Sequence, residues 1–266
     1  MELPRVIPCL LLRRGALVKT QRFKNPEYVG DPINTVRIYN EQGADELVFL
    51  DIVSTPNGVP PQFELIEEIS RECYMPFAYG GGLHRFEDIR KVFGNGAEKV
   101  VLNTAAWKEA DLVRRVAEHF GSQSVVVSID AKKGIMGKTS VVVGCGREKI
   151  GPSPEEWAQE AVDRGAGELM ITSVDREGTF AGYDRELVHR VAAAVPVPVI
   201  AHGGASSVEE MREVIQEEGA AAAAAGSLFV YRSKQRAVLI NYPGRDELDA
   251  LFGIRNPLSS SIPKAG

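Results

Sequence analysis

The chain is written roughly twice. Residues 39–50 align with residues 161–172, residues 81–90 with residues 203–212, and residues 6–15 with residues 125–134. The alignment gives two similar halves, about residues 1–121 and 122–255, each with four short apolar stretches. The halves differ in chemistry at one aligned position, because Asp130 of the second half stands where the first half has Leu11.

Short β-branched apolar runs alternate along the chain with amphipathic stretches of helical period. The runs predict strands at residues 6–11, 46–51, 76–79, 99–103, 124–130, 168–172, 197–201 and 221–225. The amphipathic stretches predict helices at residues 32–42, 63–72, 85–93, 109–119, 154–164, 185–194 and 208–217. Ser153 and Ser207, each followed by a pair of glutamates, are expected to cap two of these helices.

Strands that alternate with single helices pair in parallel through right-handed crossovers. Eight of them predict an α/β fold, a closed (β/α)8 TIM barrel built from two homologous half-barrels. An open doubly wound sheet is the alternative, but four-strand halves favour closure and no G-x-G-x-x-G motif follows an early strand. We expect one barrel over residues 1–255 and a disordered, polar, proline-containing tail over residues 256–266.

Composition excludes several classes of protein. With 266 residues, 44% of them apolar, the chain can fill one large core, and its net charge of −5 offers no basic surface for nucleic acid. The first twelve residues lack the features of a signal peptide, and no apolar run is long enough to span a membrane. Three scattered cysteines and four histidines show no disulfide or metal spacing, so we expect a cytoplasmic protein without metal or other cofactor.

In a barrel of this kind the site lies at the carboxyl ends of the strands. Glycine pairs follow the third and seventh strands, and small polar residues follow the fourth and eighth. These residues are Gly81, Gly82, Asn103, Thr104, Gly203, Gly204, Gly226 and Ser227. Glycine lets backbone amides approach an anion, so the matched loops predict two phosphate sites. The alternative is that these glycines serve only the conformation of tight turns.

Asp130 ends an apolar run and is expected at the barrel mouth, where a carboxylate can act as general acid or base. Pairing with Lys19, Lys132 or Lys133 is the alternative. Asp51 and Asp175 lie near the same rim, where each could contact a ligand or merely brace a loop.

Two further groups of residues admit two readings each. Residues 19–31 are predicted to form a long loop that mixes cations and aromatic side chains. Such a loop could be a lid over an anionic ligand, or it could be an ordinary exposed loop. Arg5, Glu46, Lys99 and Glu168 begin strands at the opposite face, where they could neutralise one another as a ring. The residues alone favour four solvated charges.

Several long strings, taken together, resemble the cyclase subunit of imidazole glycerol phosphate synthase. They are residues 40–51, 80–82, 103–106, 120–132 and 172–179, and the resemblance extends from Arg5 to about Phe229. The family is a barrel of two half-barrels that binds a substrate with two phosphates. It receives ammonia from a glutaminase subunit docked at the barrel bottom.

The resemblance implies roles for individual residues. It makes Arg5, Glu46, Lys99 and Glu168 the gate for ammonia, and Glu98 a contact to the glutaminase. It makes Lys19 a ligand-binding lid residue and Asp130 one of two catalytic aspartates. Further candidate ligand contacts in the matching strings are Ser173, Asp175 and Gly178.

The chain departs from the family where chemistry is expected. Leu11 replaces the other catalytic aspartate, and loss of one acid–base group typically costs about 10²–10⁴-fold in rate. His202 and Ser206 replace smaller residues, the insert around residues 136–147 is short, and residues 232–243 look extended rather than helical.

This set is similar to a paralogous branch associated with surface-polysaccharide genes. That resemblance implies an ammonia-conducting subunit that works with a glutaminase and a separate sugar amidotransferase. A working cyclase of histidine biosynthesis is the main alternative. A pure binding or scaffold barrel and a sugar isomerase are the others.

Overall fold

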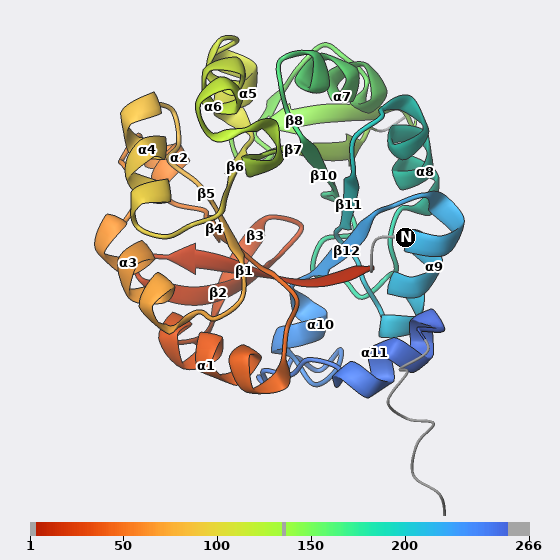
Figure 1. Cartoon of the computed structure of the whole chain (residues 1–266). Helices are drawn as coiled ribbons and strands as arrows, with labels where there is room; N and C mark the ends of the chain where they lie inside the picture. Colours follow the sequence, from red (N-terminus) through yellow and green to blue (C-terminus); the bar gives the residue numbers. More distant parts are fainter. Residues whose placement is uncertain (1–3, 135–136, 255–266) are drawn as a thin grey trace, which may run out of the picture.

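The eight predicted strands close into a parallel barrel. The computed structural model describes residues 4–134 and 137–254. Figure 1 shows the strands surrounded by helices, and β12 pairs with β1 to close the ring. In order around the barrel the strands are β1 (Arg5–Arg13), β4 (Leu47–Asp51), β5 (Phe77–Gly80), β6 (Lys99–Leu102), β7 (Val125–Lys133), β10 (Glu168–Ser173), β11 (Val199–His202) and β12 (Ala222–Ala225). The prediction of a (β/α)8 barrel is confirmed.

Amphipathic helices cover the outside of the barrel. The main ones are α1 (Pro32–Gln42), α3 (Phe63–Glu72), α4 (Phe86–Gly94), α6 (Leu112–Phe120), α7 (Pro154–Asp163), α8 (Arg185–Ala194) and α9 (Val208–Glu218). Ser153 and Ser207 cap α7 and α9 as predicted, and Ser153 forms a full capping box with Glu156. Short pieces follow several strands: α2 (Ser54–Asn57), α5 (Thr104–Lys108), α10 (Ser227–Val230) and the 3-10 turn Ser122–Ser124.

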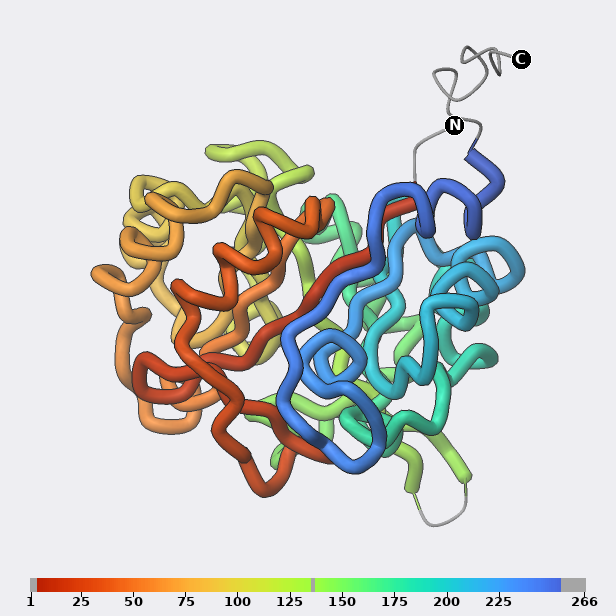
Figure 2. The backbone as a smooth tube through the Cα atoms, turned by 90° about the horizontal axis from the view of Figure 1, so that it is seen from below, coloured from red at the N-terminus to blue at the C-terminus, as the bar shows by residue number. Residues whose placement is uncertain are grey.

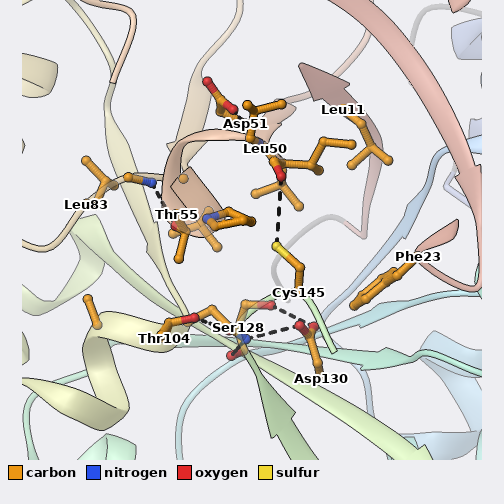
Figure 3. A pocket seen from close by; sticks show the side chains of 18 of the residues that line it. Leu11, Phe23, Leu50, Asp51, Thr55, Leu83, Thr104, Ser128, Asp130 and Cys145 are labelled. Carbon is orange, nitrogen blue, oxygen red and sulfur yellow. Dashed lines mark hydrogen bonds between the residues drawn. The ribbon is translucent and has the colours of Figure 1, made fainter. Parts of the chain in front are cut away.

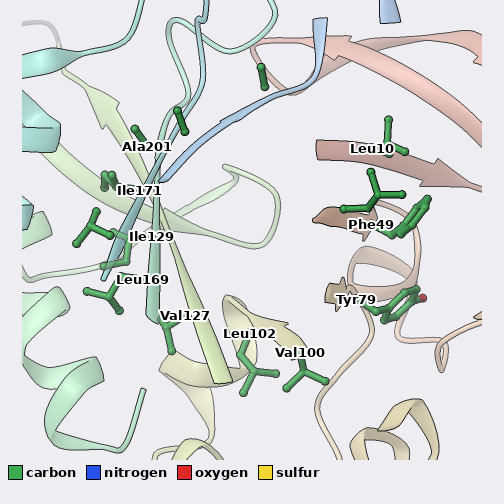
Figure 4. Packing of buried hydrophobic residues seen from close by; sticks show 14 of the residues in the cluster. Leu10, Phe49, Tyr79, Val100, Leu102, Val127, Ile129, Leu169, Ile171 and Ala201 are labelled. Carbon is green, nitrogen blue, oxygen red and sulfur yellow. The ribbon is translucent and has the colours of Figure 1, made fainter. Parts of the chain in front are cut away.

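Alternation along the strands sorts apolar side chains into two layers. Outward-facing residues pack beneath the helices, as Leu102, Val127 and Ile129 do in Figure 4. Inward-facing residues, such as Ile7 and Cys9 of β1, form a separate cluster inside the barrel. The same alternation places Arg5 at the bottom of the barrel and Leu11 at its mouth.

The prediction of a long loop over residues 19–31 is wrong. This segment belongs to a hairpin of β2 (Ala16–Gln21) and β3 (Lys24–Gly30), and β2 pairs antiparallel with the end of β1. A second extension follows β7, where β8 (Thr139–Val143) pairs with β7 and with β9 (Glu148–Lys149). Both extensions rise from strand ends at the barrel mouth.

The last described part of the chain returns to the barrel bottom. Residues 232–243 contain no helix, as expected. They form bends, a turn and coil with one bridge from Tyr231 to Val238 rather than an extended strand, and the helix α11 (Arg245–Phe252) was not predicted. The hydroxyl of Tyr242 donates to the carbonyl of Val6 at 2.9 Å, and Arg245 pairs with Asp45 at 3.0 Å. In Figure 2, α11 therefore lies beside the start of β1.

The predicted tail, residues 256–266, lies outside the described residues. Within residues 4–134 and 137–254, no helix is long and apolar enough to cross a membrane. Cys9, Cys73 and Cys145 are all free thiols.

Candidate functional site

A cavity of about 670 Å³ opens at the carboxyl ends of the strands. Its walls combine apolar side chains with cations and carboxylates, and Figure 3 shows them converging from many elements. Of the residues singled out in the sequence, it is lined by Leu11, Lys19, Asp51, Gly81, Gly82, Asn103, Thr104 and Asp130. His202 lines the same cavity, so the structure brings together residues from near both ends of the barrel, from Leu11 to His202.

Asp130 is the carboxylate best placed for proton transfer. It is 7% exposed, and it accepts hydrogen bonds from Asn103 Nδ2 at 3.2 Å and Ser128 Oγ at 3.5 Å. Burial raises the pKa of Asp130 to about 7, against the opposing effect of these hydrogen bonds. A carboxyl group with a pKa near neutrality can act as either acid or base.

The alternative that Asp130 pairs with a lysine is not supported by the described contacts. Lys133 pairs with Asp184 at 3.1 Å, and Lys19 pairs with Glu177. No described salt bridge includes Asp130, so its carboxyl group faces the cavity without a cationic partner.

Leu11 gives the cavity an apolar wall where a second carboxylate would stand. It is 8% exposed, aligns with Leu50 of β4, and lies beside Leu50 at the mouth (Figure 3). Its side chain can neither donate nor accept a proton. Among the described residues that line the cavity, the one at this position therefore offers Asp130 a hydrocarbon side chain and no second acid–base group.

Three neighbouring strands carry polar side chains in one row. Asp130, Thr172 and His202 are paired in register across β7, β10 and β11. His202 Nδ1 lies 3.0 Å from Thr172 Oγ1. Burial, assisted by the nearby Lys19 charge, lowers the pKa of His202 to about 3, so its imidazole is neutral.

The first glycine pair is sterically required. Gly81 has φ +108°, and a Cβ there would lie 2.3 Å from the Asp51 carbonyl oxygen. The amide of Gly82 donates to Thr55 Oγ1 at 2.9 Å, and Thr104 Oγ1 accepts from the Gly144 amide at 2.9 Å. The turn conformation alone therefore explains these glycines, although they also line the cavity.

The second glycine pair surrounds a much smaller space. Gly178, Gly203, Gly204, Gly226 and Ser227 line a cavity of about 10 Å³, which can hold little more than a water. Ser227 Oγ is buried and has no hydrogen-bond partner in the described structure. The two glycine loops, which occupy matching places in the sequence repeat, thus border cavities of very different volume.

Two of the predicted ligand contacts brace loops, and Asp51 does so while also lining the large cavity. The Asp51 carboxylate accepts from the Val53 and Ser54 amides at 2.8 and 3.0 Å and from Gln62 Nε2 at 3.1 Å. The Asp175 carboxylate accepts from the Lys133 amide at 2.7 Å. Neither Asp175 nor Ser173 lines either of the two cavities described above, so the structure does not place them at the site.

Lys19 lies on β2 and is 3% exposed, rather than on an open lid. It pairs with Glu177, a buried carboxylate of the loop after β10 that sequence reasoning missed. Glu177 could have been found within residues 172–179, because that string follows a barrel strand. Arg13, Arg14 and Arg147 also line the large cavity without having been predicted.

At the barrel bottom the four predicted charges form a closed ring. Arg5 contacts both Glu46, at 2.6 Å, and Glu168, while Lys99 Nζ lies 3.0 Å from Glu46 and 2.8 Å from Glu168. The solvated arrangement that the residues alone favoured is wrong, because every member contacts both opposite charges.

Glu98 is exposed at the same face, immediately before β6, and Tyr74 of a neighbouring turn is 86% exposed. Both side chains are accessible to a docked protein. No group of three or more potential metal ligands occurs in the part of the chain that the structure describes.

Comparison with known proteins agrees with this geometry. A family model described as "Histidine biosynthesis protein" matches residues 5–235. The chain is 50% identical, over 92% of its length and 98% of the relative, to "Putative imidazole glycerol phosphate synthase subunit hisF2" of Pseudomonas aeruginosa. It is 43% identical, over 85% of its length and 90% of the relative, to "Imidazole glycerol phosphate synthase subunit HisF" of Alkaliphilus metalliredigens. The chain therefore belongs to the HisF-like family of imidazole glycerol phosphate synthase cyclase subunits.

Proposed function

We propose that this chain is the ammonia-conducting barrel of a glutamine-dependent amidotransferase complex. Ammonia enters from a glutaminase subunit at the barrel bottom and leaves at the mouth. The acceptor is a sugar-type substrate of surface-polysaccharide biosynthesis, held by a separate amidotransferase. The relatives are named as subunits, which supports the proposal that this chain works in a complex. Free thiols at all three cysteines fit a cytoplasmic location.

The observation that carries this proposal is the closed ring below an apolar interior. Arg5, Glu46, Lys99 and Glu168 hold their charges at the entrance, and the side chains above them include Ile7, Val48 and Met170. Burying a charge is far more costly than burying a neutral polar group. Such an interior therefore favours passage of neutral ammonia over ammonium.

Because Leu11 replaces the second carboxylate, we propose that the ammonia acceptor is not the substrate of histidine biosynthesis. Cleavage and imidazole closure need several proton transfers, and the cavity presents Asp130 with leucine at the partner position. An ammonia conduit has no need of that second carboxylate. In this function the glycine loops bind a phosphorylated or other anionic ligand, or serve as inherited scaffold.

The second candidate is a working cyclase of histidine biosynthesis. The raised pKa of Asp130, to about 7, favours it because a carboxyl group so tuned suits acid–base work. Relatives that carry the unqualified synthase name also favour it.

A partner assay tests the first candidate. The purified chain is mixed with the glutaminase of the same organism, and binding and glutamine hydrolysis are measured. We expect complex formation and faster hydrolysis, with both weakened by Glu98→Lys at the barrel bottom. Glu87→Lys is the matched control, because Glu87 is equally a surface glutamate but lies in the first turn of α4. Absence of both binding and stimulation for the unaltered chain would refute the proposal.

Complementation of a histidine auxotroph separates the two candidates. We expect no growth with the unaltered chain. Growth that depends on Asp130 would establish the cyclase and overturn our preference. Growth only with Leu11→Asp would show that one missing carboxylate is what separates this site from cyclase activity.

A further inference from the structure

The second glycine site is closed by the chain itself. Lys19 crosses it, since a Cβ on Gly226 would lie 2.8 Å from Lys19 Cε. What is left is the cavity of about 10 Å³, with the unpartnered Ser227 hydroxyl buried at its wall. A hydroxyl buried without a partner is costly, so a hydrogen-bonding atom, of a water or of a ligand, is expected beside it.

A carboxylate of the chain itself is already paired with the cationic side chain at this site. Glu177 accepts from Lys19 Nζ, from Thr20 Oγ1 at 3.1 Å and from the Phe23 amide at 3.3 Å. All three donors come from the β2–β3 hairpin. Glu177 therefore holds its carboxylate where the hairpin would otherwise hold an external anion.

The same loop pins the hairpin through its backbone. The Arg22 amide donates to the Glu177 carbonyl at 2.9 Å, and Arg22 Nε donates to the Asp175 carbonyl at 2.9 Å. Drawing the Glu177 carboxylate away from Lys19 would release the hairpin contacts that this carboxylate itself makes, to Thr20 and to the Phe23 amide, while the two backbone contacts can remain.

We propose that Glu177 is an internal anion that keeps the second site closed. An anionic group of the phosphate class enters by taking Lys19 from Glu177, and this exchange frees the β2–β3 hairpin. The inference rests on the anion-binding role proposed above for Gly203, Gly204, Gly226 and Ser227.

Burial makes the exchange selective. Lys19 and Glu177 are 3% and 2% exposed, so neither charge can be left without a partner inside the fold. An incoming ligand must replace the carboxylate in one step and must interact with Lys19 and its surroundings more strongly than the carboxylate does. A phosphate dianion does so, because it adds charge and can also accept from Ser227 and the glycine amides. A simple monocarboxylate offers Lys19 nothing that Glu177 lacks.

The test measures inorganic phosphate binding by calorimetry and the exchange of backbone amides in residues 16–30, with acetate as the competing monoanion. The variants are Glu177→Gln, which removes the internal charge, and Ser227→Ala, which removes the free hydroxyl. Glu27→Gln is the control, because Glu27 is a half-exposed hairpin carboxylate that pairs with Arg236 at 3.4 Å outside the small cavity.

We expect phosphate, but not acetate, to speed amide exchange in the hairpin of the unaltered chain. Burial lowers the pKa of Lys19 to about 7, so binding is measured at or below pH 7, where Lys19 can be protonated. There Glu177→Gln should bind phosphate about tenfold more tightly or better, because phosphate no longer competes with a carboxylate for Lys19. Ser227→Ala should bind phosphate more weakly, and Glu27→Gln should behave as the unaltered chain does. If Glu177→Gln does not fold, Glu177→Asp shortens the carboxylate and should tighten binding in the same direction.

Two outcomes overturn the proposal and differ in what they leave standing. If the unaltered chain and Glu177→Gln bind phosphate equally and phosphate leaves amide exchange in the hairpin unchanged, Glu177 is not an internal anion, but the anion site itself stands. Absence of phosphate binding in every variant removes the anion site as well.

Discussion

Replacing Asp130 by asparagine should stabilise the protein at pH 8 and leave its stability nearly unchanged near pH 4. Asp130 is buried, and its described partners are the neutral side chains of Asn103 and Ser128. Burial raises its pKa from 3.8 to about 7. Asparagine has nearly the same shape and carries no charge at any pH. Its Oδ1 can accept from Asn103, and its amide can donate to Ser128 Oγ once that hydroxyl turns to accept.

The sign follows from where the proton resides. Between about pH 4 and pH 7 the folded chain keeps the Asp130 proton that the unfolded chain releases, so the free energy of unfolding falls as pH rises. Each pH unit in this window costs about 1.4 kcal/mol, which gives an upper bound on the order of 4 kcal/mol at pH 8. The stabilisation by Asp130→Asn should grow across the same window and then level off.

Urea unfolding of both proteins at several values between pH 4.5 and 8 measures the difference. Asp51→Asn is the control, because Asp51 accepts several hydrogen bonds on both carboxylate oxygens and asparagine can accept on only one. It should destabilise by about 1–3 kcal/mol throughout. Stability curves for Asp130→Asn and the unaltered chain that stay parallel from pH 4.5 to 8 would refute the reasoning.

Three further substitutions, one with a glycine control, test other parts of the structure by urea unfolding. Gly81→Ala should cost well over 2 kcal/mol, because at φ +108° its Cβ would overlap the Asp51 carbonyl. Gly43→Ala, at φ +70° with open space, should cost about 1 kcal/mol, and equal costs would contradict the argument. Glu46→Gln should cost about 1–3 kcal/mol, because it leaves two partly buried cations short of a carboxylate, and a neutral result would show that the ring is solvated. Ser153→Ala should cost about 1 kcal/mol through loss of the capping box of α7, and no change would mean that the helix is held by packing alone.

The fold was largely readable from local patterns. Strand and helix periods, with serine caps, predicted the barrel strands and seven outer helices to within a few residues. These signals are local, because each depends on side chains a few positions apart. The hairpin after β1 was missed because residues 19–31 are polar and lack strand alternation. They form strands by pairing within the hairpin, which β1 anchors through residues 16–18. Helix α11 was missed too, and the contacts that hold it and the preceding Tyr242 to the barrel, at Asp45 and Val6, are distant in sequence.

The sequence by itself determined the order of the barrel strands, several of the residues at their carboxyl ends, and that Leu11 stands opposite Asp130 in the repeat. Only the tertiary structure decided their chemical state. The pKa of Asp130 depends on burial among strands from the whole chain, and the bottom ring depends on four strand starts meeting at one point. The contact of Lys19 with Glu177, which closes the second glycine site, joins residues 158 positions apart. Composition and spacing cannot report such distances, because burial and charge pairing are properties of the closed barrel.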